Sequence, residues 1–184
     1  SRYDLADALM ADMEKLSISP SNYTLGILVK MYGRRRQLDK AFELVENAPK
    51  RFGFPANSQV LTCLMGACLN NNAIDRALRV FQDVKQANRG ADGKAFGSMV
   101  GGCVRRGELQ KAVALVEEAY GLSTGPGMYK LSPGQSIAAE NLEKLVQALA
   151  QQGMAETVAV PLLDRLRAAK APVNGRLYSA ALNA

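Results

Sequence analysis

The 184-residue sequence contains no histidine and no tryptophan, and it has only three cysteines. Without histidine there are no imidazole general bases, no histidine-containing catalytic triads and no histidine ligands for zinc. Cys63, Cys68 and Cys103 match neither a zinc spacing nor a redox pair, so we expect buried thiols in a reducing compartment. No apolar run approaches the length of about 18 residues that crosses a bilayer. The sequence therefore predicts no metal, no cofactor and no membrane insertion.

The charge of the chain is unbalanced toward the basic side. The 23 lysines and arginines exceed the 17 acidic residues and give a formal charge of +6. A basic surface favours an acidic partner, of which nucleic acid is the commonest. A protein partner stays open, because proteins of ribosomes and organelles are often basic without contacting bases.

One pattern recurs along the chain at a nearly constant interval. Ala41, Ala77 and Ala112 each follow a basic residue and have an aliphatic residue three positions before them, and the steps between them are 36 and 35 residues. A fixed period of this size is typical of stacked supersecondary units. We expect the three alanines to lie at equivalent, tightly packed positions on successive helices.

Each period contains a helical hairpin. In the unit 58–92, apolar residues at helical spacing cover 58–68, the asparagines 70–72 form a turn, and a second apolar helix starts near Ile74. The same layout divides the chain into an incomplete unit, four units and a truncated unit, which are 1–21 (a second helix only), 22–57, 58–92, 93–138, 139–174 and 175–184. Because both ends are incomplete units, we expect an internal part of a longer array.

Two segments depart from the period. Residues 121–135 are rich in glycine and proline and are expected to form an inserted loop at one edge, suited to contact a partner. The loop lacks the Gly-Lys-Ser/Thr sequence of a phosphate-binding loop. Pro161 falls within a predicted second helix, so we expect it near a helix start or a kink.

The unit endings carry a family resemblance. Asn57 and Asp92 end their units, the segments 18–21 and 54–57 place proline one or two residues before the end, and Leu177–Leu182 reads Leu-Tyr-Ser-Ala-Ala-Leu. These features resemble the pentatricopeptide repeat (PPR) family, whose unit is a helical hairpin of about 35 residues. The tetratricopeptide repeat fits less well, since it requires an early tryptophan and a period of 34.

The resemblance implies an all-α fold, a right-handed α-solenoid of helix-turn-helix repeats. It also implies single-stranded RNA as the ligand, with about one base read per repeat. The reading positions of the family are the fifth and the last residue of a unit. In this chain they are Gly26 with Asn57, Thr62 with Asp92, Gly97 with Ala138, Glu143 with Asn174, and Ser179 in the truncated unit. Of these pairs, Thr62 with Asp92 matches a family pair that implies guanine.

The resemblance implies further RNA contacts outside the reading positions. The family stacks bases between second-position side chains, where this chain has Tyr23 and Lys94, and contacts phosphates near the ends of the first helices, where it has Arg34 and Arg105. The alternative for the run Arg34–Arg36 is a solvated turn.

The function implied is RNA binding in a mitochondrion or chloroplast, in the processing, stabilisation or translation of a transcript. The alternative is a scaffold that binds proteins within a larger organellar assembly such as a ribosome. The glycines at reading positions and Glu143 favour the scaffold, whereas Thr62 with Asp92 favours RNA. We expect no enzymatic activity from this segment, and a catalytic tail beyond it stays open.

Overall fold

The computed structural model describes residues 4–87, 90–123 and 129–182, so residues 124–128 of the predicted loop lie outside it. Within the described ranges the chain forms ten α-helices and one π-helical turn, without any β-strand, and the predicted all-α class is confirmed. The elements are α1 (Asp4–Lys15), α2 (Asn22–Arg34), α3 (Leu38–Phe52), α4 (Ser58–Asn70), α5 (Ile74–Gln86), α6 (Gly93–Arg105), α7 (Leu109–Tyr120), α8 (Ala139–Gln151), η1 (Ala155–Ala159), α9 (Val160–Ala168) and α10 (Gly175–Leu182).

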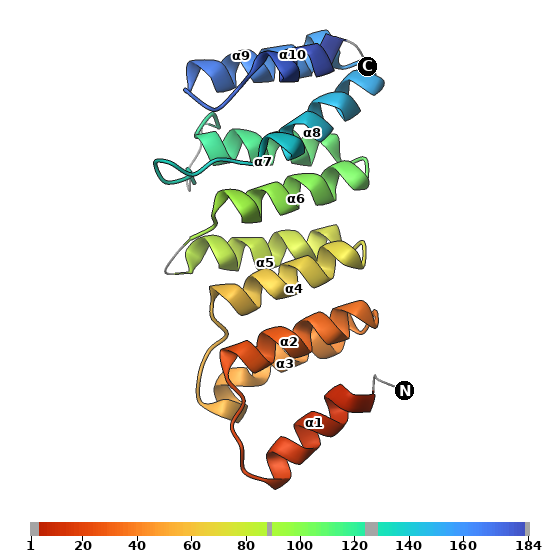
Figure 1. Cartoon of the computed structure of the whole chain (residues 1–184), viewed down its shortest axis with the longest axis vertical. Coiled ribbons are helices and arrows are strands. Elements are labelled where there is room, and N and C mark those ends of the chain that lie inside the picture. The colour runs from red at the N-terminus through yellow and green to blue at the C-terminus, as the bar shows by residue number, and fades with distance from the viewer. Residues whose placement is uncertain (1–3, 88–89, 124–128, 183–184) are drawn as a thin grey trace. The chain divides into compact units, whose positions relative to one another are not determined.

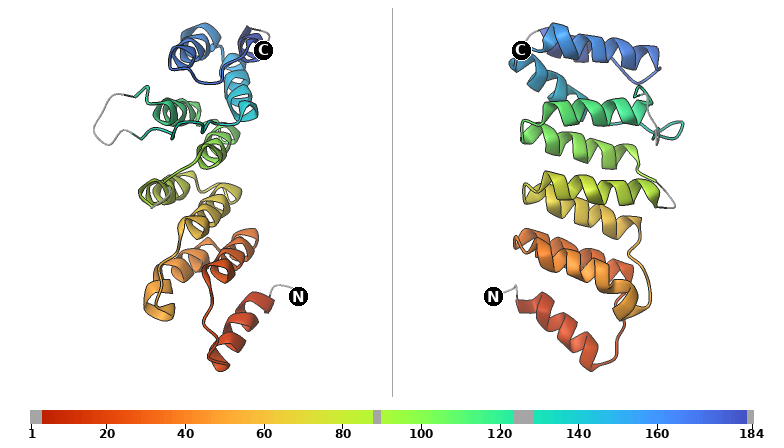
Figure 2. Two further views of the ribbon diagram at one scale, coloured as in Figure 1. Left: turned by 60° about the vertical axis from the view of Figure 1, so that its left-hand side comes forward. Right: turned by 180° about the vertical axis from the view of Figure 1, so that it is seen from behind.

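The chain divides into two compact units, residues 1–90 and 91–184, which are described separately. In the first unit α2 pairs with α3, α4 pairs with α5, and α2 packs directly against α4 (Figure 1). In the second unit α6 pairs with α7, and α8 packs against both α6 and α10. Within each unit the first helices of the hairpins form one layer and the second helices another (Figure 2). The division into numbered repeats of a single array stays a prediction.

All four hairpin turns are closed by the same backbone hydrogen bond. An amide just before the second helix donates to the carbonyl oxygen five residues earlier, at 2.9–3.0 Å. This bond belongs to the Schellman ending of a helix, which requires a left-handed residue immediately before the donor. The left-handed residues are Arg36, Asn72, Gly107 and Gly153, with φ between 59° and 74°.

The three recurring alanines occupy the same place in their hairpins. Ala41, Ala77 and Ala112 are each the fourth residue of a second helix, α3, α5 and α7 respectively. All three have no exposed surface. The prediction of equivalent, tightly packed positions is therefore confirmed, and a larger side chain at any of them would overpack the interior.

The fourth hairpin reaches a similar arrangement through the π-helical turn η1. The amides of Val158 and Ala159 both lie within hydrogen-bonding distance of the Met154 carbonyl oxygen, at 3.1 and 3.0 Å. A π-turn holds one residue more than an α-turn, so the fully buried Ala159 lies five residues after the turn donor instead of four. Pro161 follows directly after η1, in the first turn of α9, which is the position near a helix start that the sequence predicted.

Two of the three cysteines are core residues. Cys68 and Cys103 are both eleventh in their first helices and fully buried, and their carbonyl oxygens accept the turn-closing bonds. Burial raises the pKa of Cys68 to about 11 and also raises the pKa of Cys103. Both side chains are therefore protonated thiols at neutral pH and poor nucleophiles. Cys63 is half-buried.

The described part of the inserted segment folds back onto the hairpin of α6 and α7. The Tyr129 hydroxyl donates to the Ala91 carbonyl oxygen at 2.7 Å, and the Ile137 amide donates to the Tyr120 hydroxyl at 3.1 Å. Ile137 is only 1% exposed. This part of the insertion therefore contributes to the core of the second unit, and its predicted contact with a partner stays a prediction.

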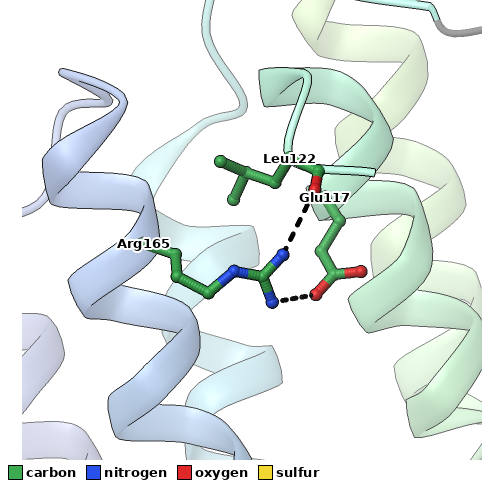
Figure 3. A network of polar contacts seen from close by, with 3 residues as sticks. All are labelled: Glu117, Leu122 and Arg165. Carbon is green, nitrogen blue, oxygen red and sulfur yellow. Dashed lines mark hydrogen bonds and ion pairs between the residues drawn. The ribbon is translucent and has the colours of Figure 1, made fainter. Parts of the chain in front are cut away.

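Arg165 connects α9 to the end of α7. Its guanidinium donates to the Glu117 carboxylate at 2.6 Å and to the Leu122 carbonyl oxygen at 3.3 Å (Figure 3). The Arg165 side chain is about half exposed, with 49% of its surface accessible. Solvent screening limits such a pair to about 1 kcal/mol or less, so it orients α9 more than it stabilises the unit.

Replacing a buried alanine should destabilise the chain. We expect Ala77→Leu to lower the free energy of unfolding by roughly 1–3 kcal/mol, because the extra carbon atoms have no space. Urea denaturation measures the change. Ala114→Leu, at an exposed position of α7, is the control and should have little effect. Equal effects of the two substitutions would contradict the close packing at Ala77.

Two glycine substitutions should change the free energy of unfolding in opposite directions. Gly107 has φ of 74°, so Gly107→Ala should cost about 1 kcal/mol of left-handed strain. Gly66 lies within α4 with open space where a β-carbon would be, so Gly66→Ala should stabilise by about 0.5–1 kcal/mol. Thermal unfolding of both variants checks this. An unchanged or raised melting temperature for Gly107→Ala would show that the turn does not require left-handed backbone.

Candidate nucleic-acid interface

The residues that end three of the predicted units are helix N-caps. The side chains of Asn57, Asp92 and Asn174 accept hydrogen bonds from backbone amides in the first turns of α4, α6 and α10, at 2.8–3.2 Å. Asparagine and aspartate are favoured there because the first amides of a helix have no partner within it. The unit-ending residues therefore have a structural role in addition to the one that the family resemblance implies.

The other two first helices begin differently. Ser21 caps α2 in a capping box, with the Thr24 amide donating to its hydroxyl at 3.3 Å. Ala138 precedes α8 without a side-chain cap. The side chain of Ala138, the last residue of the third predicted unit, thus offers a hydrogen bond neither to the helix nor to a ligand.

Asparagines also connect successive hairpins within the first unit. The backbone amide of Asn57 donates to Asn22 Oδ1 at 3.0 Å, which joins the starts of α2 and α4. At the other end of these helices, Asn71 Nδ2 donates to the carbonyl oxygens of Gly33 and Ala67, at 2.7 and 2.8 Å. The sequence analysis identified Asn71 only as a turn residue, because the partner lies one repeat away.

Two of the predicted fifth positions have exposed hydroxyl side chains. Thr62 and Ser179 both lie on first helices with their surfaces open to solvent. The Thr62 hydroxyl donates to the Ser58 carbonyl oxygen at 2.8 Å, one turn earlier in α4. Its oxygen can still accept a hydrogen bond from a ligand.

The two fifth-position glycines are covered by the next first helix. A β-carbon at Gly26 would lie 3.7 Å from Cys63 Sγ, which is an ordinary contact. A β-carbon at Gly97 would lie 2.6 Å from Asn141 Nδ2, which is too close unless Asn141 moves. The glycine at 97 therefore provides space for the Asn141 amide.

Glu143, the fourth predicted fifth position, is engaged in an ion pair. Arg176 Nε lies 3.2 Å from Glu143 Oε1, and the two residues belong to α10 and α8. The Glu143 side chain is 21% exposed, whereas that of Arg176 is 77% exposed. The ion pair with Arg176 offsets the negative charge of Glu143, which would otherwise repel a phosphate-rich ligand. It also engages the Glu143 carboxylate that would have to contact a base.

The pair predicted to read guanine, Thr62 and Asp92, is divided between the two units. Thr62 lies in α4 of the first unit, and Asp92 caps α6 in the second. Both residues are exposed, and one carboxylate oxygen of Asp92 accepts from the Ala95 amide at 2.8 Å. Their joint contact with a base stays a prediction.

The predicted stacking and phosphate-contacting side chains are all exposed. Tyr23, at the start of α2, is 76% exposed, and Ile27 is 40% exposed one turn later. Lys94 is exposed in the first turn of α6, and Arg34 and Arg105 are exposed in the last turns of α2 and α6. A cation near a helix C-terminus is also favoured by the helix dipole, so the geometry is compatible with phosphate contact and with a solvated turn.

Other kinds of site find no support in the described ranges. No group of three or more cysteine, aspartate or glutamate side chains there could hold a metal ion. None of the helices described has the length and apolar character needed to cross a membrane.

Comparison with known proteins identifies the repeat. The sequence profile of the PPR repeat matches residues 23–50 and 94–119, which include most of the hairpins α2–α3 and α6–α7. These two hairpins are pentatricopeptide repeats. The crystal structure of the pentatricopeptide repeat protein PPR10 from maize is similar over 95% of this chain and 23% of that one, with a TM-score of 0.66 and 18% identity. The predicted helical-repeat fold class is therefore confirmed.

Several proteins resemble this chain over part of their length. The mitochondrial 15S rRNA processing factor CCM1 of Komagataella phaffii is 26% identical over 98 residues, which cover 52% of this chain and 14% of that protein. A chloroplastic PPR-containing protein of Arabidopsis thaliana is 26% identical over 158 residues, which cover 83% of this chain and 16% of the relative. Another PPR-containing protein of Arabidopsis is 32% identical over 117 residues, 62% of this chain and 19% of the relative. The chain spans less than a fifth of the length of these relatives.

The capping role of Asp92 can be separated from base reading. We expect Asp92→Ala to lower the free energy of unfolding by about 1 kcal/mol, because the first turn of α6 loses its side-chain acceptor. Asp92→Asn should leave stability nearly unchanged, since asparagine caps equally well. Chemical denaturation of both variants checks this. Equal destabilisation by the two substitutions would mean that the charge, and not the cap, stabilises α6.

Proposed function

We propose that this PPR chain binds single-stranded RNA through the exposed face of its first helices. The observation that carries the proposal is that the PPR profile matches two hairpins whose first helices begin with the exposed side chains of Tyr23 and Lys94. An aromatic ring can stack on a base, and a lysine can neutralise a phosphate. The net charge of +6 supports an acidic ligand.

Within this proposal the individual residues have different tasks. Thr62 and Asp92 select guanine, because the carboxylate accepts from base N–H groups and the hydroxyl accepts or donates. Asp92 combines this task with its cap, since a carboxylate has two oxygens and α6 uses one of them. Gly26 offers no side chain to a base. In the repeat 22–57, Asn57 is therefore the only reading residue with a polar side chain. Arg34 and Arg105 contact phosphates and carry no sequence information.

The cellular setting is proposed from the relatives. One of them is named a mitochondrial rRNA processing factor and another a chloroplastic PPR protein. We infer that this chain acts in a mitochondrion or chloroplast, in the processing, stabilisation or translation of an organellar transcript. The chain binds RNA in this account and does not itself cleave or modify it.

A protein-binding scaffold is the second candidate. The ion pair of Glu143 with Arg176 occupies one reading position, and side chains are exposed at the apolar residues Leu16 and Ile18 between α1 and α2. An exposed apolar group suits a protein partner better than a phosphate-rich strand. This candidate predicts that the chain binds no RNA even at low salt.

A salt series of RNA binding tests the proposal. Each arginine that neutralises a phosphate of a single strand contributes about 0.7 to the slope of the logarithm of the binding constant against the logarithm of salt concentration. We expect Arg34→Ala and Arg105→Ala each to flatten the slope by that amount, with all RNA sequences weakened alike. Filter binding with single-stranded oligonucleotides measures the slope.

The matched control for the salt series is Arg79→Ala. Arg79 is an exposed arginine on the second helix α5, so its removal should leave the slope unchanged. Equal slopes for all three variants and the unaltered chain would mean that the basic turns are solvated and do not contact phosphates. Absence of binding by the unaltered chain at low salt would replace RNA binding by the scaffold.

A further inference from the structure

The Asn141 side chain occupies an unusual place between two first helices of the second unit. Asn141 is the third residue of α8, and its amide lies against α6, where Gly97 and Gly101 have no side chains. A β-carbon at Gly97 would lie 2.6 Å from Asn141 Nδ2, and one at Gly101 would lie 3.3 Å from Oδ1. The amide therefore fills the volume into which a fifth-position side chain of the third repeat would project.

Most of the other first helices have an apolar residue at this position. The third residue of α2 is Thr24, which is polar and half-buried. The third residues of α4, α6 and α10 are instead Val60, Ala95 and Leu177, which are at most 3% exposed. Simple filling of space beside Gly97 would be served by an apolar residue, as in those helices. A carboxamide costs free energy at such a place unless its donor and acceptor are satisfied.

The Asn141 amide has hydrogen-bonding capacity to spare. Among the residues that the structure describes, none forms a hydrogen bond with its side chain. Its two polar atoms nevertheless keep contact with solvent, because the sole buried side-chain nitrogen or oxygen without a partner in the described ranges is Gln37 Oε1. The amide thus packs beside Gly97 and Gly101 of α6 and is partly accessible to solvent.

The residues expected to read a base in this repeat cannot do so. Gly97 and Ala138 hold the fifth and last positions, and neither has a polar side chain. Lys94, at the second position of the same repeat, is exposed and available to a phosphate. The third repeat therefore offers the positive charge of Lys94 to a phosphate. Its two usual reading positions, however, have no side-chain donor or acceptor for a base.

We infer that Asn141 supplies the base-reading group of the third repeat, in place of Gly97. The inference rests on the proposed RNA binding. A carboxamide presents a donor and an acceptor side by side, so it can pair with a base edge that offers an adjacent acceptor and donor, as asparagine does with adenine. Asn141 belongs to the following repeat, so the reading group reaches its base from the neighbouring helix.

The experiment is selection of RNA ligands from a random single-stranded pool by the chain and by Asn141→Ala, followed by affinity measurement on the selected sequence. We expect Asn141→Ala to abolish the base preference at one nucleotide only, and to weaken binding to the preferred sequence by about 5- to 150-fold, the range of a good base contact. The salt slope should stay unchanged, because Asn141 neutralises no phosphate.

Two further variants separate reading from packing. Asn141→Asp keeps the shape but removes the donor, so the preference at that nucleotide should shift toward bases that donate. The double variant Gly97→Asn/Asn141→Gly returns an amide to the fifth position itself and should restore a preference at the same nucleotide. Gln147→Ala, which removes an exposed carboxamide elsewhere on α8, is the control and should change nothing.

The outcomes distinguish this inference from the proposed function. RNA binding by Asn141→Ala and Asn141→Asp with the unaltered base preference would overturn the reading role and leave RNA binding in place. Absence of binding by the unaltered chain at low salt would overturn the proposed function, and the inference with it. Circular dichroism melting shows that each variant is folded under the conditions of the assay.

Discussion

The structure depends on the burial of short amphipathic helices against one another. The helices have 8 to 15 residues, and isolated helices of this length are marginal in water. Each hairpin therefore needs its partner helix and its neighbours to be stable, and the fully buried alanine near the start of each second helix permits that approach. The fourth hairpin meets the same requirement for close packing in a different way. Its π-turn adds one residue to the backbone, and a buried alanine again follows the turn.

The same dependence restricts what the first helices can offer to a ligand. Their buried faces pack within the units, and their N-terminal amides are satisfied by Asn57, Asp92 and Asn174. A residue that caps a helix and reads a base must divide its lone pairs between the two tasks. Aspartate can do so with two carboxylate oxygens, whereas asparagine has one oxygen for the cap and an amide nitrogen left for a ligand. Where the reading position is a glycine, a side chain from the next first helix can occupy the space beside it, as Asn141 does beside Gly97.

The sequence predicted the local structure well because its signals are local. The helical hairpins and the place of Ala41, Ala77 and Ala112 followed from periodicity, which reflects one face of a helix, and the family resemblance added the all-α solenoid class. The contacts of Asn71, Asn141 and Arg176 could not be predicted, because each joins residues more than 30 positions apart whose approach depends on packing. The π-turn could not be predicted either, because no residue pattern in the sequence marks the one-residue shift that it causes.

Photo-cross-linking of RNA to the chain tests the central claim most directly. A single-stranded RNA pool containing 4-thiouridine would be bound at low salt, irradiated and mapped by mass spectrometry of the cross-linked peptides. The account predicts cross-links in the first helices α2, α4, α6 and α8, near their N-terminal turns. Cross-links confined to the second helices α3, α5, α7 and α9, or none at all, would contradict an RNA-binding face built from the first helices.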